Sequence, residues 1–481
     1  MRRLRRIPLP LLAVLGVVLV EGLAWAFAVP ALQGADESAH FSYVQKLADA
    51  HVMPWRNPDL GYLEPAYPPS VSTEQRVAWT WAGLEPLRGN RAARPLWTHE
   101  DERIWARENA KLTPDHRTDG AGSRVVDNPP LYYLTAVVPY EIAGGTFFDR
   151  LYALRVYNVA LLLVAVALTW LLAGELFGRR RELQTLAAAA VALHPVLLDV
   201  ATRVTPDVLL LTLASAALYL MTLVVKRGPS WRRVAGLLAV VAAACLTQGR
   251  GLGLVAPALF AVGLGWWRAR GAPRPGVLGR VPAVVPWAVG ALVVLVAFAA
   301  YATRFDFGEL AGFWSYLWQF YLPPLPGMTD PIGVSWDVEN VYLNRFFGTF
   351  VQFEVDFPPD LLRAIRVAVF AGLALLAVSA WRHRRALWAR RDVVAVLLVA
   401  FVLSVLALHA AAFRSLLVNP ADPVITGRYL LMLIPLYGIG VAAAVAAFPG
   451  RVRALASGGL LGALVLLQLS AFGLVVERFY A

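Results

Sequence analysis

The feature that most constrains this chain is a series of long apolar runs separated by short loops that carry basic residues. An α-helix needs roughly 20 predominantly apolar residues to cross the hydrocarbon core of a bilayer. Only 16% of the residues are charged, against about 25% in soluble proteins, so few charges interrupt the runs. The runs lie near residues 8–30, 151–176, 184–202, 206–225, 233–247, 251–267, 281–303, 361–381, 393–413, 429–448 and 455–476. They predict an all-α, polytopic membrane protein of about eleven spanning helices.

The basic residues indicate on which side of the membrane each loop lies, because short cytoplasmic loops are enriched in Lys and Arg. Six clusters together hold 22 of these residues, and they lie at 2–6, 179–181, 226–233, 268–280, 382–391 and 451–453. The short loops on the other side hold only Arg203, Arg250, Arg414 and Arg428. We therefore expect a multi-pass plasma-membrane protein with a cytoplasmic N-terminus. The division of the charge among separate loops also argues against a nucleic-acid partner.

The segment 131–147 is a twelfth candidate span, and the orientation depends on it. It contains Pro139 and Glu141, and its apolar part is short. If this segment crossed the membrane, the basic cluster at 2–6 would lie opposite all the others. We therefore expect it to lie along, or to dip into, the outer interface.

This orientation divides the chain into three regions. They are a membrane-embedded module at 1–303 with a first outer loop at 31–150, a second outer loop at 304–360, and C-terminal spanning helices at 361–481. Surface helices are expected in both loops. The second loop holds fifteen aromatic residues between Phe305 and Phe357. Because Tyr and Trp favour the membrane interface, the loop is expected either to anchor at the lipid headgroups or to line a groove for sugar or lipid.

An acidic pair, Asp36-Glu37, stands directly after the first apolar run. The residues that follow have the spacing of an amphipathic helix, with Phe41 and Val44 on one face and Gln45 on another. Asp36 could therefore simply cap this helix. The alternative is chemical, because adjacent carboxylates at the outer face can act as a general base or bind a divalent cation.

The chain resembles the GT-C glycosyltransferases, in particular the branch that contains the protein O-mannosyltransferases and the aminoarabinose transferases. The similar segments are Asp36-Glu37, Asn128-Pro129-Pro130-Leu131-Tyr132-Tyr133, Arg150 to Asn158, Glu175 to Arg180, His194-Pro195, Thr205-Pro206-Asp207, Gln248-Gly249-Arg250-Gly251 and Gly427-Arg428-Tyr429. The resemblance implies a seven-span module, a variable set of C-terminal helices, and inverting transfer from a polyprenyl-phosphate sugar. Ser38 and Arg250 depart from the family, which often has Pro and Lys at these places.

The resemblance and the chemistry of the side chains together suggest roles for the polar residues of the outer face. The expected catalytic residues are Asp36 as the general base, Glu37 and Asp207, and a divalent metal could bind Asp36 and Glu37. The expected ligands of the donor phosphate are Arg428, Arg203 and Arg250, because a guanidinium group suits a phosphate. His40, Tyr132, Tyr133 and Trp318 are expected to bind substrate.

Each of these roles has a structural alternative. Asp207 could stabilise the start of a helix, and the arginines could contact lipid headgroups. His40 could form a plain hydrogen bond with Asp36, and the aromatic residues could anchor the protein at the interface.

The predicted function is transfer of a hexose or pentose from a polyprenyl phosphate to a glycan, lipid or protein acceptor of the cell envelope. No phosphate-binding P-loop and no dinucleotide-binding fingerprint is present in the sequence. The short cytoplasmic loops leave no room for a domain that binds a nucleotide sugar, which favours a donor embedded in the membrane. The alternative is a transporter or flippase of lipid-linked glycans, although such proteins usually carry internal repeats, and none is evident here.

Overall fold

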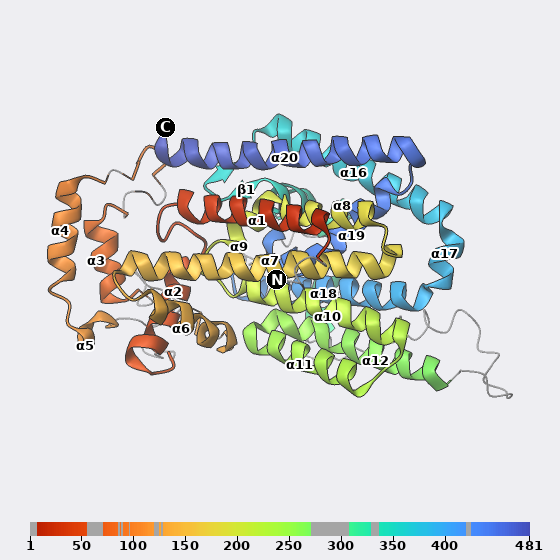
Figure 1. Cartoon of the computed structure of the whole chain (residues 1–481), viewed down its shortest axis with the longest axis horizontal. Coiled ribbons are helices and arrows are strands. Elements are labelled where there is room, and N and C mark those ends of the chain that lie inside the picture. The colour runs from red at the N-terminus through yellow and green to blue at the C-terminus, as the bar shows by residue number, and fades with distance from the viewer. Residues whose placement is uncertain are drawn as a thin grey trace.

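The protein is described by a computed structural model that covers residues 7–54, 71–84, 87, 90–95, 97–119, 125–126, 128–270, 307–328, 336–419 and 425–481. Most of these residues are helical, and the long helices form a bundle (Figure 1). One small sheet occurs within these ranges, where β1 (Thr349–Phe350) pairs antiparallel with β2 (Val355–Asp356). The architecture therefore confirms the expected all-α fold.

Eight helical segments of the described residues are long and apolar enough to cross a membrane. Six of them are single helices: α1 (Leu9–Ala28), α7 (Phe147–Phe177), α10 (Asp207–Arg227), α16 (Pro359–Arg382), α18 (Arg391–Val418) and α20 (Gly450–Tyr480). The other two are composite. The segment Gly249–Ala269 joins η3 (Gly249–Leu254) to most of α12 (Val255–Arg270), and Gly427–Val445 joins η6 (Gly427–Leu433) to α19 (Ile434–Val445). The pair α8 (Arg181–Ala192) and α9 (Pro195–Ala201) is bent by 59° and counts as a ninth span if the two helices cross together. These segments confirm a polytopic membrane protein.

Three further segments were predicted as spans or candidate spans. The short run at 233–247 forms α11 (Trp231–Thr247), whose 17 residues are at the lower end of what can cross a bilayer. The run predicted at 281–303 lies outside the described residues. The twelfth candidate span, at 131–147, forms α6 (Leu131–Ala143), which has only 13 residues and is too short to cross a bilayer.

The helices of the first loop gather at one end of the bundle (Figure 1). They are α2 (Glu37–Ala50), α3 (Thr73–Trp81), α4 (His99–Asn109), α5 (Pro114–Arg117) and α6. The basic helix α17 (Arg384–Ala389) lies at the other end, between α16 and α18 (Figure 1). The acidic pair and the basic cluster at 382–391 are thus at opposite ends of the molecule.

Local signals in the sequence define several helix ends. Thr146 and Asp149 form a capping box at the start of α7, and Gly178 ends this helix with a left-handed φ of 68°. The α8–α9 bend coincides with His194-Pro195, where the His194 side chain accepts a hydrogen bond from the backbone N–H of Leu197. A predicted single span at 184–202 is therefore two short helices, because Pro195 cannot continue the hydrogen-bond ladder of α8.

Small residues let the spanning helices approach each other closely. A Cβ atom at Gly22 of α1 would lie 2.9 Å from the Val159 side chain of α7. Gly438 of α19 lies against the backbone of Ala187 in α8 in the same way. Close contact of this kind stabilises helix pairs in lipid, where the hydrophobic effect between helices is absent.

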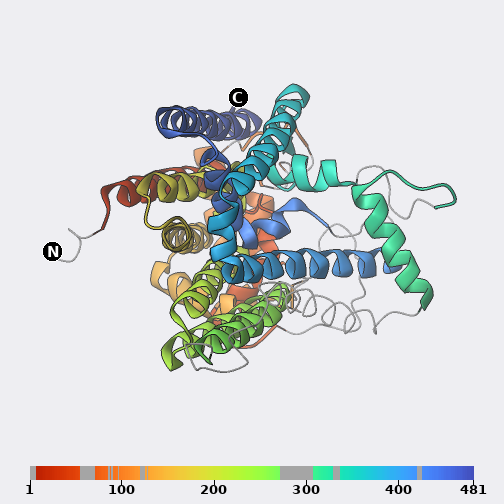
Figure 2. The ribbon, with the colours of Figure 1, turned by 90° about the vertical axis from the view of Figure 1, so that its right-hand side faces the viewer.

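The aromatic-rich loop packs against the C-terminal helices. Its helix α14 (Phe307–Tyr321) crosses one end of α18 at the side of the bundle (Figure 2), and Phe313 contacts Phe413. His409 of α18 is bonded through Nδ1 to the hydroxyl of Tyr316 and through Nε2 to that of Tyr321. The π-helical turn η5 (Glu339–Asn344) and the short α15 (Arg345–Phe347) complete this region.

Candidate functional site

Asp36 lies in the turn between α1 and α2, at the N-cap position of α2. Its backbone has φ 58°, in the left-handed region that non-glycine residues seldom occupy. Its side chain makes no capping hydrogen bond, and 51% of it is exposed. Capping therefore does not explain this carboxylate, and an uncommon backbone conformation at an exposed polar group is typical of functional sites.

The Asp36 carboxylate is paired with Arg428, which is at the start of η6. The distance from Oδ2 to Nη2 is 3.0 Å. Burial raises the pKa of the Asp36 carboxyl, but the Arg428 guanidinium and the nearby His40 outweigh it, so this pKa lies below the ordinary 3.8. Asp36 is therefore ionised at neutral pH and available as a proton acceptor.

A second ion pair, between Asp207 and Arg250, adjoins the first. Asp207 begins α10, and Arg250 comes from the turn η3; Nη2 of Arg250 contacts Oδ1 of Asp207. The same Nη2 donates to Oε1 of Gln248 at 2.7 Å. The ring of Tyr429 joins the two pairs, because the guanidinium carbons of Arg250 and Arg428 lie 4.4 and 5.4 Å from its centroid.

Glu37, the neighbour of Asp36, has a different environment. Its side chain is fully buried, and Arg155 of α7 binds both carboxylate oxygens, at 2.8 Å from Nε and 2.6 Å from Nη2. The backbone N–H of Val204 donates to Oε1. The catalytic or metal-binding role expected for Glu37 does not fit this arrangement, because the carboxylate is enclosed and its oxygens are occupied. The geometry instead fits a residue that positions Asp36.

Arg155 is a residue of the site that the sequence reasoning missed. Besides Glu37, it donates to the backbone carbonyls of Ala26, Val29 and Pro30, at the end of α1. It therefore fastens the end of α1 to the start of α2 and fixes the turn that carries Asp36. An arginine inside a predicted span was the signal that could have identified it, since a charge there needs a partner.

Arg203 is also enclosed. It is 2% exposed, its Nη2 donates to Asp199 at 3.0 Å, and its Nη1 donates to the carbonyl of Trp25. Gly34 lies directly on its side chain, where a Cβ atom would come within 2.7 Å. This packing leaves no room for a phosphate, so the expected role in donor binding does not fit Arg203.

The expected substrate-binding tyrosines are in the protein interior. Tyr132 and Tyr133 are both fully buried, so neither offers a face to a sugar ring. Tyr132 donates to Oδ1 of Asn158, and Tyr133 stacks on Tyr43 with ring centroids 3.7 Å apart. The Tyr133 hydroxyl is bonded to Nδ1 of His40 at 2.9 Å.

His40 lies near the carboxylates, whereas Trp318 belongs to another region. Burial lowers the pKa of His40 to about 4, although Asp36 and Asp207 act in the opposite direction, so the imidazole is neutral at pH 7. Trp318 is on α14, 39% exposed, and its indole N–H donates to the carbonyl of Pro323. This exposure fits an interfacial anchor at least as well as a sugar contact.

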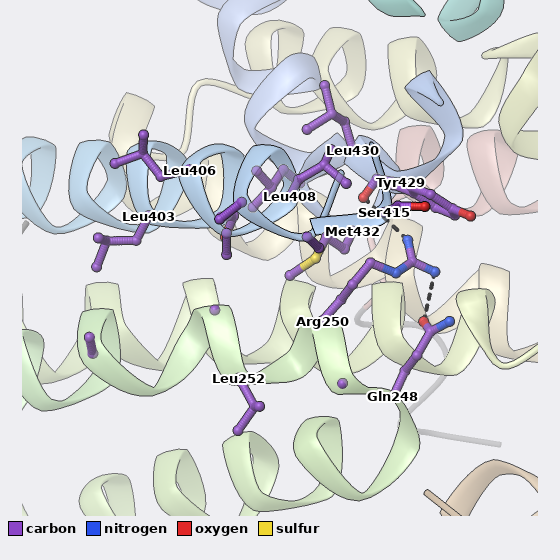
Figure 3. Close-up of a pocket in the computed structure, with 18 of the residues that line it drawn as sticks. Gln248, Arg250, Leu252, Leu403, Leu406, Leu408, Ser415, Tyr429, Leu430 and Met432 are labelled. Atoms are coloured by element: carbon purple, nitrogen blue, oxygen red, sulfur yellow. Dashed lines mark hydrogen bonds between the residues drawn. The ribbon is translucent and has the colours of Figure 1, made fainter. Parts of the chain in front are cut away.

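Arg250 and Tyr429 line a groove of about 810 Å³ (Figure 3). Its polar end is formed by Asn128, Gln248, Arg250 and Tyr429. The rest of its lining is almost entirely apolar and comes mainly from α18 and from η3 with α12; it includes Leu252, Gly253, Ala256, Leu403, Leu406, Ala407, Leu408 and Ala411. Between Leu403 and Ser415 the groove follows α18 for roughly 18 Å.

The residues present do not fit the divalent metal that the sequence analysis gave as possible. In the part of the chain that the structure describes, no three His, Cys, Asp or Glu side chains converge on one point. Four carboxylates of this region each have an arginine partner: Asp36, Glu37, Asp199 and Asp207. Each of these carboxylates is thus already paired with a guanidinium group.

Comparison with solved structures finds similarity to an archaeal oligosaccharyltransferase from Archaeoglobus fulgidus. Its apo form has 15% sequence identity and a TM-score of 0.45 over 97% of this chain and 56% of that one. A complex of the same enzyme, AglB, with an inhibitory peptide and a dolichol-phosphate gives 14% identity and a TM-score of 0.47, over 98% and 56% of the two chains. The chain thus spans about 56% of the length of these structures.

Comparison at the level of sequence gives a family. No curated protein matches the chain. A family described as "Predicted membrane protein (DUF2142)" matches residues 19–437, which include both ion pairs, Arg155 and the whole groove. A match over this much of the sequence shows that the chain belongs to the DUF2142 family of predicted membrane proteins.

Proposed function

We propose that this protein is a membrane glycosyltransferase of the GT-C type that moves one sugar from a polyprenyl phosphate to an acceptor outside the cytoplasm. The observation that carries the proposal is that Arg250, the partner of Asp207, lines the polar end of an apolar groove beside Tyr429. The Asp36–Arg428 pair adjoins this end, because Arg428 packs against the ring of Tyr429. A polyprenyl phosphate has the same division into an apolar chain and an anionic head. Ligand sites of this kind combine a largely apolar lining with a few convergent polar groups.

The prenyl chain would lie along α18, and the phosphate would lie beside Arg250 and Arg428. Arg250 lines the groove directly, while Arg428 packs against the ring of Tyr429, which also lines it. Arginine suits a phosphate because its donors form a planar fork.

The transfer step uses Asp36 as the general base. The carboxylate accepts the proton of an acceptor hydroxyl, and the acceptor oxygen forms a bond to the anomeric carbon of the donor sugar. The bond from that carbon to the phosphate oxygen breaks, and the polyprenyl phosphate leaves with the electron pair. Attack opposite the leaving group inverts the anomeric carbon, and the two arginines neutralise the negative charge that develops on the phosphate.

The active face is assigned to the extracytoplasmic side by the distribution of Arg and Lys. The chain has one cysteine, Cys245, so a Cys245→Ser background allows a single reporter cysteine to be placed at will. In intact cells, Lys111→Cys in the first loop should react with a membrane-impermeant maleimide, and Arg385→Cys in α17 should react only after lysis. The reverse pattern would place the carboxylates in the cytoplasm and overturn the proposed orientation.

The enzyme activity is tested with purified protein in lipid nanodiscs and a panel of radiolabelled polyprenyl-phosphate hexoses and pentoses. The wild type should transfer label to a cell-envelope extract, and Asp36→Asn should lower the rate by roughly 100- to 10,000-fold. Asp119→Asn, at an exposed carboxylate of the first loop, is the matched control and should leave the rate unchanged. Full turnover by Asp36→Asn would eliminate Asp36 as the base.

A second assay separates transfer from transport. In proteoliposomes, a flippase would move the lipid-linked sugar to the opposite leaflet without modifying any acceptor. Movement without transfer by the wild-type protein would favour the transporter and overturn the proposal.

A further inference from the structure

A series of three hydrogen-bonded side chains leads from the groove to His40, whose imidazole feels the charge of the carboxylates. Asn128, which lines the polar end of the groove, donates from Nδ2 to the Tyr133 hydroxyl at 3.2 Å. The same hydroxyl is bonded to Nδ1 of His40 at 2.9 Å. His40 is one helical turn after Asp36, and its imidazole is influenced by the charges of Asp36 and Asp207. These hydrogen bonds therefore lead from Asn128, which a bound donor would contact, to His40, which follows the proposed base in α2.

The direction of the hydrogen bonds in this series decides which nitrogen of His40 carries the proton. The Tyr133 oxygen accepts from Asn128, and the phenol has a single proton to donate. Among the described residues, Nδ1 of His40 is the remaining partner of this buried hydroxyl. If His40 donated as well, the phenolic proton would have no acceptor, and a buried donor without a partner is costly. The hydroxyl thus donates to Nδ1, and the imidazole proton is on Nε2.

The charged groups that act on His40 have both signs. The carboxylates of Asp36, Asp207 and Glu37 act on the imidazole, opposed by the guanidinium of Arg428. Which ring nitrogen of a neutral imidazole carries the proton is set by the hydrogen bond that the other nitrogen makes. Burial keeps the ring neutral, so the proton on Nε2 is its only one.

We infer that Asn128 and Tyr133 are positioning residues that hold His40 in the neutral Nε2–H tautomer, so that His40 offers one hydrogen-bond donor to the hydroxyl oxygen that Asp36 deprotonates. His40 transfers no proton in this arrangement; its N–H orients a lone pair of the attacking oxygen while Asp36 takes the proton. The part of the inference that concerns substrate rests on the proposed function, whereas the tautomer does not.

The tautomer can be measured without any substrate. The protein is labelled with ¹⁵N-histidine, reconstituted in nanodiscs and studied by solid-state NMR at pH 7, where the two ring nitrogens of each tautomer have distinct shifts. The chain has seven histidines, and the signals lost in His40→Gln assign His40. The expected result is a protonated Nε2 and an unprotonated Nδ1.

Asn128→Asp is the informative variant, because a carboxylate accepts hydrogen bonds but cannot donate one. Tyr133 must then donate to residue 128, His40 must donate from Nδ1, and the tautomer should reverse. Asn90→Asp is the control, since its exposed side chain only accepts a bond from the N–H of Ala92, which an aspartate can also do. Tyr133→Phe should leave a mixture of tautomers, whereas Tyr157→Phe, at a tyrosine bonded to Thr135, should not.

A wild-type His40 with its proton on Nδ1, or an Asn128→Asp protein with an unchanged tautomer, would overturn the inference. If the tautomer reverses in Asn128→Asp, kcat for sugar transfer should fall by about 10- to 100-fold with a smaller change in KM. A reversed tautomer with unchanged kcat would overturn the positioning role. Failure of the proposed function would be recognised separately, as absence of transfer by the wild type while the NMR result stands.

Discussion

Glu37 and Arg155 form an ion pair in which both side chains are fully buried, 118 residues apart in the sequence. The two parallel hydrogen bonds make the pair bidentate, and the remaining donors of Arg155 bind the backbone at the end of α1. The carboxylate next to it in the sequence, Asp36, is half-exposed. The left-handed turn at Asp36 thus turns one carboxylate inward as an anchor and leaves its neighbour at the surface.

Removal of Arg155 is expected to destabilise the protein strongly. Arg155→Met leaves the Glu37 carboxylate buried without its ion-pair partner, which costs about 3 to 5 kcal/mol in pairs of this kind. The measurement is the unfolding free energy or thermal midpoint of the purified protein in detergent. The double variant Arg155→Met/Glu37→Gln should recover part of the loss, because no charge is then left unpaired.

Arg363→Gln is the matched control for this prediction. Arg363 is paired with Asp360 on α16, with both side chains largely exposed, and pairs of this kind contribute little. A loss in Arg155→Met no larger than that in Arg363→Gln would contradict the anchoring role of Arg155.

The same pair gives a prediction for the pH dependence of stability. Burial raises the pKa of Glu37, but Arg155 and Arg203 outweigh it, so in the folded protein this pKa lies below the ordinary 4.5. The unfolded state therefore takes up protons first as the pH falls, and the stabilisation is complete above about pH 4.5 and is lost below it. The difference in unfolding free energy between wild type and Glu37→Gln should be constant from pH 7 to 5 and should shrink below 4.5. If the difference in unfolding free energy between the two proteins grew on acidification, the pKa of Glu37 would not be lowered in the folded protein, and the prediction would be wrong.

Much of the fold could be predicted from the sequence because apolar runs of spanning length have few alternative structures in a bilayer. The shortness of α6 agrees with the expectation from the distribution of charge that 131–147 does not cross. The bend between α8 and α9 was not predicted, although His194-Pro195 signals it. The packing of α14 on α18 could not be predicted, because aromatic residues suit both a lipid interface and a protein interior.

The candidate site was harder to predict because similar side chains have different partners in three dimensions. Asp36 and Glu37 are chemically alike, yet the second is enclosed by Arg155 from a distant helix. Arg203 and Arg250 both lie in short loops, but the first is packed under Gly34 and the second lines the groove. Such differences arise from tertiary contacts, which the local sequence pattern does not encode.

The ring of Tyr429 is expected to hold the two guanidinium groups in place for phosphate. Tyr429→Leu removes its contacts with Arg250 and Arg428, each worth about 0.5 to 2 kcal/mol, and should weaken binding of undecaprenyl phosphate by about 3- to 30-fold. Tyr429→Phe keeps the aromatic face and the backbone carbonyl that Arg250 contacts, so it should bind as the wild type does. Binding is measured by native mass spectrometry in nanodiscs. Equal affinity of the Leu and Phe variants would show that the ring has no such role.

The groove itself is tested by filling it at Ala407, a small residue of α18 whose side chain lines it. Ala407→Trp should place an indole where the prenyl chain would lie and weaken binding of undecaprenyl phosphate about tenfold or more, since each loss of about 1.4 kcal/mol is a factor of ten. Val402→Trp adds similar bulk to the same helix at an exposed position outside the groove lining, and should change neither affinity nor thermal midpoint. Because Ala407 is exposed, its variant should also keep the wild-type midpoint. Undiminished lipid binding by Ala407→Trp would show that the donor chain lies elsewhere.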